Sequence, residues 1–398
     1  MTETRSDIQQ QADKYMFQTY GRFPITLVKG EGCHVWDETG KEYIDFVGGI
    51  AVCALGHSSP IVTKALIEQS KELVHVSNLY YTVPQVRLAK LLVENSFADR
   101  AFFCNSGAEA NEAAIKLARR YSYEKYGAGR NTIISMKNSF HGRTMATMSA
   151  TGQDKIKKGF DPFLAGFKFV PFNDVSAIET AIDETICAVM LEPVQGEGGV
   201  IIADHEYLKK VREMCDKKNI LLIFDEVQAG VGRTGRLFAY ENFNVAPDIM
   251  TLAKALGNGL PIGAMLAREE LSSVFGPGSH ATTFGGTPLV TAVAEAVINT
   301  IINDGILEKC RETGRYFREK LGLLKDKYSF IKDIRGIGLI NGLEMDIPGA
   351  PIVTECINRG FLINCSQEKI LRFVPPLIIS KDEVDLLVIN LDDIFGKC

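Results

Sequence analysis

The fold is decided by LLIFDEVQAGVGRTG, residues 221–235, and by TLAKALGNGLPIGA, residues 251–264. A short apolar run of the length expected for a buried strand accompanies each stretch, at residues 220–224 and 249–253. An acid, Asp225, comes directly after the first run, and an amine, Lys254, comes directly after the second. Because side chains that follow neighbouring strands can emerge at the same edge of a sheet, we expect Asp225 and Lys254 to face one site.

An acid and an amine at neighbouring strand ends suit one cofactor in particular, pyridoxal 5'-phosphate (PLP). Its aldehyde condenses with a lysine amine, and its pyridine nitrogen needs an acid that keeps it protonated. The pair therefore predicts Lys254 as the point of covalent attachment and Asp225 as the partner of the ring nitrogen. A second interpretation of LLIFDEV is a Walker B strand in a nucleotide hydrolase. It requires a G-x-x-x-x-G-K-[ST] loop, and the sequence contains none.

Short apolar runs alternate with longer amphipathic segments through the middle of the chain. We predict strands at residues 101–104, 132–136, 167–171, 187–191, 220–224, 249–253 and 263–267. Most of these runs are separated by enough residues for a helix, which indicates βαβ units and a mainly parallel sheet covered by helices. The last two runs are joined by a short connection, so we expect the last strand to be antiparallel.

The pattern changes after Pro288, where helical segments precede a mixture of strands and helices. We predict helices at residues 289–303, 305–326 and 381–395, and strands at residues 330–345, 361–365 and 370–379. Near the N-terminus the turn DETGKEY, residues 37–43, predicts a hairpin between residues 33–36 and 43–46. The fold class is therefore α/β, with a large domain and a smaller α+β domain.

Composition and charge exclude several classes of protein. The chain has 398 residues, 46% of them hydrophobic, and a formal net charge of -5 without a basic block, so we expect no nucleic-acid partner. The N-terminal stretch lacks the apolar core of a signal peptide, and no run approaches the roughly 20 apolar residues of a membrane span. Nine scattered cysteines predict free thiols in the cytoplasm, and the histidines show no metal-ligand spacing.

The stretch FFCNSGAEANEAAIKLARRY, residues 102–121, predicts a strand, a turn and a helix. Alanine and leucine recur at helical spacing from Ala110 to Ala118, which gives the helix one apolar face. The helix then begins at Ser106, Gly107 and Ala108, whose free N–H groups favour a phosphate. An ordinary capped helix is the alternative, and the neighbouring Asp225 and Lys254 favour the phosphate site.

Four further motifs carry candidate binding residues. In NSFHGRT, residues 138–144, Phe140 could stack on a pyridine ring and Arg143 could pair with a substrate carboxylate. Glu197 lies in the glycine-rich stretch LEPVQGEGG, residues 191–199, and Arg372 lies in LRFVPP, residues 371–376. SHATTFGGTP, residues 279–288, offers hydroxyls to a phosphate oxygen. Each motif also has an ordinary structural interpretation: a core aromatic, a solvated charge or a glycine-rich turn.

Together these strings resemble the class-III PLP-dependent aminotransferases, also called ω-aminotransferases. The resemblance runs from about Tyr20 to Arg372 and includes FHGRT, EPVQGEGG, FDEVQAGVGRTG, AKALGNGLPIGAM and TTFGGTPL. It implies the fold-type I architecture: a large domain with a seven-stranded sheet, here residues 56–290, and a small domain at residues 291–398. It also implies that an N-terminal segment, residues 1–55, joins the small domain, and that two identical chains form a dimer with active sites at the interface.

The resemblance assigns roles to individual residues. For the cofactor, it implies a covalent bond with Lys254, an Asp225 contact to the ring nitrogen, a Gln228 hydrogen bond to the ring hydroxyl and stacking by Phe140. The phosphate would contact Gly107, Ala108 and, from the other subunit, Thr283. For substrates, the resemblance implies contacts from Arg143 and Thr282. It also implies a switching ion pair between Glu197 and Arg372, in which the glutamate masks the arginine until an α-carboxylate binds.

The expected substrates follow from the same resemblance. The sequence is most similar to family members that transfer the δ-amino group of N2-acetylornithine to 2-oxoglutarate in arginine biosynthesis, by a ping-pong mechanism. Succinyldiaminopimelate, succinylornithine, 4-aminobutyrate and ornithine remain alternative amino donors. Ile50 argues against ornithine, because ornithine-specific members tend to carry a tyrosine at this position.

Overall fold

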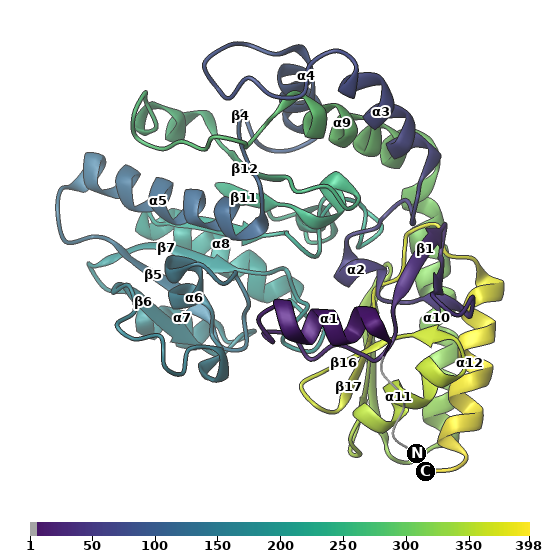
Figure 1. Ribbon diagram of the computed structural model, residues 1–398. Coiled ribbons are helices and arrows are strands. Elements are labelled where there is room, and N and C mark those ends of the chain that lie inside the picture. The colour runs from purple at the N-terminus through teal and green to yellow at the C-terminus, as the bar shows by residue number, and fades with distance from the viewer. Residues whose placement is uncertain (1–5) are drawn as a thin grey trace.

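The seven predicted strands form one sheet in the computed structural model, which describes residues 6–398 (Figure 1). The strands lie in the order β4-β12-β11-β10-β7-β5-β6. Only β12 is antiparallel to its neighbours, so the mainly parallel sheet and the reversed last strand are both confirmed. Their bounds are β4 (Arg100–Cys104), β5 (Thr132–Met136), β6 (Phe167–Val170), β7 (Ile186–Leu191), β10 (Leu221–Asp225), β11 (Ile249–Leu252) and β12 (Gly263–Ala267).

Helices cover both faces of this sheet because the side chains on both faces of the central strands are apolar. Ile223 of β10 packs in a cluster with the alanines of α5 (Gly107–Tyr126). Leu222 and Phe224 point the other way, into a cluster with α7 (Val175–Ala181) and α8 (His205–Lys218). The result is three layers, with the ends of the strands left free to carry a site.

Two smaller sheets involve the ends of the chain. One contains β13 (Ile331–Ile337), β14 (Ile340–Met345), β16 (Asn364–Ser366) and β17 (Ile370–Phe373). The other contains β1 (Leu27–Glu31), β2 (His34–Asp37), β3 (Glu42–Asp45) and, from far along the chain, β15 (Phe361–Leu362). The predicted N-terminal hairpin is confirmed by antiparallel pairing of β2 with β3. Strand β3 also pairs in parallel with β15, which ties the N-terminal strands to the C-terminal part.

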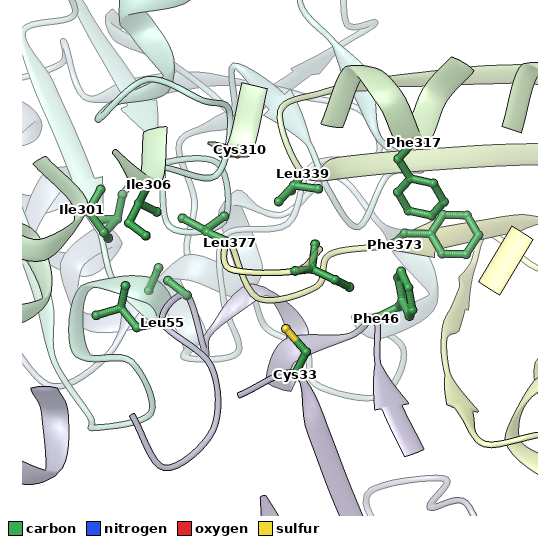
Figure 2. Packing of buried hydrophobic residues seen from close by; sticks show 14 of the residues in the cluster. Cys33, Phe46, Leu55, Ile301, Ile306, Cys310, Phe317, Leu339, Phe373 and Leu377 are labelled. Carbon is green, nitrogen blue, oxygen red and sulfur yellow. The ribbon is translucent and has the colours of Figure 1, made fainter. Parts of the chain in front are cut away.

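One hydrophobic cluster joins the N-terminal segment, the helices after residue 288 and the C-terminal strands (Figure 2). The Phe317 ring lies 5.8 Å from that of Phe46 and 5.1 Å from that of Phe373, measured between centroids. This packing brings three distant parts of the sequence together, while the domain boundaries at residues 55 and 290 stay a prediction. Residues 1–5 of the predicted N-terminal segment lie outside the described residues.

The remaining helices and short strands complete the chain. The C-terminal helices are α9 (Pro288–Asn303), α10 (Ile306–Lys327), α11 (Ala350–Asn358) and α12 (Lys381–Phe395). The others are α1 (Asp7–Tyr15), α2 (Gly48–Ala51), α3 (Pro60–Ser70), α4 (Val83–Glu94) and α6 (Met145–Ala150), with 3-10 helices η1 (Asp154–Ile156), η2 (Ala239–Asn242), η3 (Lys254–Gly257) and η4 (Glu269–Val274). A two-residue ladder joins β8 (Val194–Gln195) to β9 (Ile201–Ile202).

Three predicted strands are partly wrong. The run at residues 330–345 is a hairpin of β13 and β14, because the chain reverses at residues 338 and 339. The run at residues 370–379 is a strand only as far as Phe373, since Pro375 and Pro376 have no N–H for a sheet. The run at residues 361–365 divides into β15 and β16, which belong to different sheets. A continuous apolar run therefore predicted strands that are longer than the observed ones, because the chain leaves one sheet within the run.

The part of the chain from residue 6 onward contains no single helix long and apolar enough to cross a membrane. Helices α9 and α10 meet the length and composition criterion only as a pair, bent by 66°.

Candidate active site

A cavity of about 460 Å³ lies at the edge of the large sheet where β7, β10 and β11 end. Its wall contains the polar residues that end or follow these strands: Glu192, Asp225 and Lys254. The sheet therefore brings Asp225 and Lys254 to one cavity. The other predicted site residues on its wall are Ser106, Gly107, Ala108, Phe140, Arg143, Glu197 and Gln228.

Three donors hold the Asp225 carboxylate in place. Asn111 Nδ2 donates to Oδ2 at 2.7 Å, and the His141 ring nitrogen Nδ1 lies 2.7 Å from the same oxygen. The backbone N–H of Val227 donates to Oδ1 at 3.0 Å. Asn111 is fixed in turn by the Thr251 hydroxyl, which donates to its Oδ1 at 2.7 Å. This buried network fixes the orientation of Asp225 at the cavity wall.

The Lys254 amine makes no hydrogen bond or ion pair with any residue from 6 to 398. Its backbone has φ of 45°, a left-handed conformation that is strained for a lysine and is typical of functional sites. Burial lowers the pKa of the amine, and the Arg372 guanidinium acts in the same direction, against the carboxylates of Glu197 and Asp225. A larger fraction of the amine is therefore neutral, and the neutral form is the nucleophile.

Helix α5 presents its N-terminus to the cavity. Ser106 caps the helix, with its hydroxyl accepting the Glu109 N–H at 3.2 Å. The first N–H groups, at Gly107 and Ala108, have no partners within the helix and carry its positive dipole end. A Cβ atom added to Gly107 would lie 2.6 Å from Val227 Cγ1, so glycine allows close approach of the helix to the turn after β10. This end of the cavity suits an anion such as phosphate.

Glu197 and Gln228 line another wall and form a hydrogen-bonded group with Arg372, which is buried and does not itself line the cavity. Arg372 Nη1 donates to Glu197 Oε1 at 2.6 Å and lies 3.4 Å from Gln228 Oε1, while Gln228 Nε2 donates to Glu197 at 3.3 Å. Burial on its own would raise the pKa of the Glu197 carboxyl. The positive charges of Arg372 and Lys254 have a larger, opposite effect, so the pKa of Glu197 is lowered. The structure thus brings the predicted ion pair together, and the switching role stays a prediction.

Phe140 and Arg143 lie in the loop after β5. The Phe140 N–H donates to Glu192 Oε2 at 3.0 Å, which anchors this loop to the end of β7. The Arg143 guanidinium lies 5.6 Å from the centroid of the Phe140 ring. Arg143 is exposed and also borders a second cavity of about 610 Å³, which shares Phe140, Arg143 and Glu197 with the first. Its cation is therefore placed at the junction of the two cavities.

Thr282 and Thr283 do not line the cavity within one chain. The Thr282 hydroxyl accepts from Asn105 Nδ2 at 3.2 Å and from the Gly285 N–H at 3.2 Å. Thr283 is exposed. The contact that the sequence predicts from Thr283 requires a second chain, and it stays a prediction.

Three site residues were missed or undervalued in the sequence. Asn111 is a polar residue on the apolar face of α5, and that position was the available signal. His141 lies in the stretch NSFHGRT beside Phe140, and it contacts Asp225 directly. Glu192 follows a buried strand much as Asp225 ends one, so the argument that found one could have found the other.

The residues present fit the predicted cofactor. A fixed carboxylate, an unpaired, half-buried amine and a helix N-terminus lie around one cavity, as PLP requires for its ring nitrogen, aldehyde and phosphate. Within residues 6–398 no group of three or more histidine, cysteine, aspartate or glutamate side chains is arranged to hold a metal ion.

Comparison with known proteins agrees with this arrangement. Residues 15–395 match the family model described as "Aminotransferase class-III". An acetylornithine aminotransferase from Caldanaerobacter subterraneus subsp. tengcongensis is 53% identical over 385 residues, which cover 96% of this chain and 98% of that protein.

Solved structures of related enzymes share the fold. N-acetylornithine aminotransferase from Stenotrophomonas maltophilia K279a aligns with a TM-score of 0.84 at 37% identity, over 98% of both chains. Ornithine aminotransferase from Toxoplasma gondii, a structure described as having partial occupancy of PLP at its active site, aligns with a TM-score of 0.94 at 34% identity, over 99% of this chain and 95% of that one. The chain therefore belongs to the class-III aminotransferase family.

Proposed function

We propose that this protein is a PLP-dependent aminotransferase that transfers the δ-amino group of N2-acetylornithine to 2-oxoglutarate in arginine biosynthesis. The products are N-acetylglutamate 5-semialdehyde and glutamate. The observation that carries the proposal is the unpaired, half-buried Lys254 amine on the same cavity wall as the Asp225 carboxylate. The choice of donor is supported by the relative that is 53% identical over nearly the whole chain.

When bound, PLP supplies an aldehyde that accepts the amino group and a cationic ring that withdraws electrons from the reacting carbon. Lys254 would provide the attachment point for the aldehyde, and its Nζ, when not attached, would be the base that takes the proton from the substrate carbon. Asp225 would stabilise the proton on the ring nitrogen, and Asn111 and His141 keep its carboxylate oriented for this. Phe140 would cover the ring, Gln228 would donate to the ring hydroxyl, and Ser106, Gly107 and Ala108 would bind the phosphate.

The amino donor and 2-oxoglutarate use the same cavity but carry their carboxylates at different positions. A different arginine therefore has to bind the substrate carboxylate in each half-reaction. Arg143 binds the carboxylate of the acylated donor, with Thr282 at the edge of the site. Arg372 binds the α-carboxylate of 2-oxoglutarate or glutamate, after Glu197 has moved aside. The direct contact of Glu197 with Arg372 at 2.6 Å supports this, since a masked arginine cannot bind the wrong carboxylate.

We also propose a homodimer in the cytoplasm. Large apolar side chains lie exposed on the single chain, among them Leu79 at 81%, Tyr81 at 99% and, next to Thr283, Phe284 at 63%. A second copy that covers them would bring its Thr283 to the phosphate. All nine cysteines are free thiols, in agreement with a reducing compartment. The large and small domains are proposed at residues 56–290 and 291–398, with residues 1–55 joined to the small domain.

Ornithine is the second candidate donor, because the Toxoplasma gondii ornithine aminotransferase aligns with a TM-score of 0.94. A panel of amino donors with 2-oxoglutarate, compared by kcat/KM, separates the candidates. We expect N2-acetylornithine to exceed ornithine, 4-aminobutyrate and the succinylated donors by about tenfold or more. A colourless purified protein that transfers an amino group from none of these donors would overturn the proposal. A preference for ornithine would change only the proposed amino donor and would leave the PLP-dependent aminotransferase function in place.

A further inference from the structure

Three carboxyl groups face the cavity, and their hydrogen bonds differ. Asp225 accepts from three donors, and Glu197 pairs with Arg372 and Gln228. Glu192 accepts one hydrogen bond, from the Phe140 N–H to Oε2, and no other contact with a described residue satisfies its second oxygen. Glu192 is 5% exposed and borders the cavity, so its second oxygen has no protein donor and is available to a group bound there.

We infer that Glu192 is un-ionised in the working enzyme and donates its carboxyl O–H to an anionic oxygen on the ring side of the bound cofactor. This inference rests on the proposed function. Neither the sequence motifs nor the proposed reaction gives Glu192 a role of its own.

The charges around Glu192 support the proton on this residue. From the end of β10 it faces the Asp225 carboxylate, from η3 the Lys254 amine, and from the loop after β8 the Glu197 carboxylate, which Arg372 neutralises. When two carboxyl groups lie close together and carry one negative charge between them, the charge favours the group with more hydrogen-bond donors. Asp225 has three donors and Glu192 has one. Burial, and then the Asp225 charge, raise the pKa of Glu192 well above its ordinary range.

The position of Glu192 selects the acceptor. Its charged neighbours Asp225 and Lys254 belong to the ring end of the cavity, whereas the phosphate end is the N-terminus of α5. A neutral carboxylic acid in an apolar site is a strong donor to a developing or fixed anion. Glu192 thereby adds a second donor beside Gln228, whose amide is already engaged with Glu197.

Glutamine imitates an un-ionised glutamate, so Glu192→Gln tests the inference in the PLP-loaded protein. The readouts are the Kd for PLP and the pH midpoint of the visible absorbance of the bound cofactor. We expect Glu192→Gln to change Kd by less than about threefold and to leave the midpoint within about 0.5 pH unit. Glu192→Leu removes the donor and should weaken PLP binding by about tenfold or more.

Matched controls remove a negative charge from the same cavity. Asp225→Asn and Glu197→Gln should each lower the midpoint by about one unit or more, since a lost anion destabilises the neighbouring cation. A similar lowering in Glu192→Gln would show that Glu192 is ionised and would overturn the inference. An absence of PLP binding in the unmodified protein would instead overturn the proposed function.

A second measurement does not require the Glu192 variant to fold. Among residues 6–398, Glu226 is the other glutamate whose pKa burial raises strongly, to about 8, so Glu226→Gln removes its signal. In that background, protein labelled with ¹³C at the glutamate carboxyl carbons should keep one protonated carboxyl signal at about pH 7. Absence of this signal in the folded, PLP-loaded protein would exclude an un-ionised Glu192.

Discussion

At the scale of single residues, the groups of the site differ in how many partners they have. Lys254 has no partner among the described residues, Asp225 has three donors, and Glu192 has one. These differences decide which group carries a proton and which one reacts. They arise because the side chains that end three neighbouring strands meet loops with different donors.

Replacement of Lys254 tests the covalent role. We expect Lys254→Ala to abolish turnover and to leave no residue that borohydride can trap with PLP, because the amine is the only attachment point proposed. Intact mass after borohydride treatment checks this directly. The control is Lys157→Ala, which replaces a lysine outside this cavity and should retain both the adduct and turnover. A PLP adduct that persists in Lys254→Ala would contradict the assignment.

Replacement of Glu197 tests the ion pair. Glu197→Ala exposes the buried cation of Arg372, so we expect α-carboxylate substrates to gain access in the wrong half-reaction. The ratio of kcat/KM for N2-acetylornithine to that for glutamate as amino donor should fall by about tenfold or more. If the ratio is unchanged while stability decreases, the pair is structural and does not act as a switch.

At the scale of elements, tight contacts at strand and helix ends position the site. Gly107 allows α5 to approach Val227, because a Cβ atom at this position would lie only 2.6 Å from Val227 Cγ1. We expect Gly107→Ala to displace the helix N-terminus and to weaken PLP binding by about tenfold, since N–H contacts to phosphate depend on close approach. Equilibrium dialysis of PLP measures the change.

The matched control for Gly107→Ala lies in another helix. A Cβ atom added to Gly322 of α10 would meet no other atom within 4 Å, so Gly322→Ala should leave PLP binding unchanged and raise stability slightly. Equal loss of PLP binding in both variants would mean that the effect is not local.

Glu226 links two elements and makes stability depend on pH. Its carboxyl follows β10 and accepts the N–H groups of Ala239 and Tyr240 at the start of η2. Burial raises its pKa to about 8, whereas an unfolded glutamate has a pKa of about 4.3. The folded form binds the proton more tightly, so this contribution is full below about pH 4 and is lost as pH rises toward about 8.

Glutamine at position 226 cannot ionise, so the Tm difference between Glu226→Gln and the unmodified protein should shift in favour of the variant as pH rises from about 6 to about 8.5. Calorimetry across this range measures it. The amide loses one of two backbone hydrogen bonds, which lowers Tm at every pH, so only the pH dependence is diagnostic. A constant difference would contradict the raised pKa.

The sequence predicts the elements that repeat a simple pattern. Apolar runs separated by helix-length segments identified the large sheet, and the short connection before β12 identified its reversal. The sequence did not predict that residues 361–365 change sheets, because strand partners far apart in sequence leave no local signal. Likewise Asp225 was found from its place after an apolar run, whereas its contact with Asn111 depends on how α5 lies against the sheet.

At the scale of the whole molecule, exposed apolar side chains predict association. Tyr81 is 99% exposed and Leu79 is 81% exposed, which is unusual for side chains of this size. We expect Leu79→Asp with Tyr81→Asp to shift the protein from dimer to monomer and to reduce activity, because Thr283 of a second chain would no longer reach the site. Sedimentation velocity measures the change.

Ile389 on α12 provides the control for that experiment. It is 65% exposed and lies in the C-terminal part of the chain, so Ile389→Asp should leave the sedimentation coefficient and activity unchanged. A monomeric but fully active double variant would contradict the proposed contribution of Thr283.

The parallel pairing of β3 with β15 has a consequence for biogenesis. While the ribosome is still translating the middle of the message, β1, β2 and β3 have emerged but lack their last neighbour. The large sheet, from β4 to β12, can assemble before β15 is made, because all of its strands precede β15 in the chain. Strand β3 gains this last neighbour only after residue 362 has left the exit tunnel, so we expect its outer edge to stay unpaired for most of synthesis.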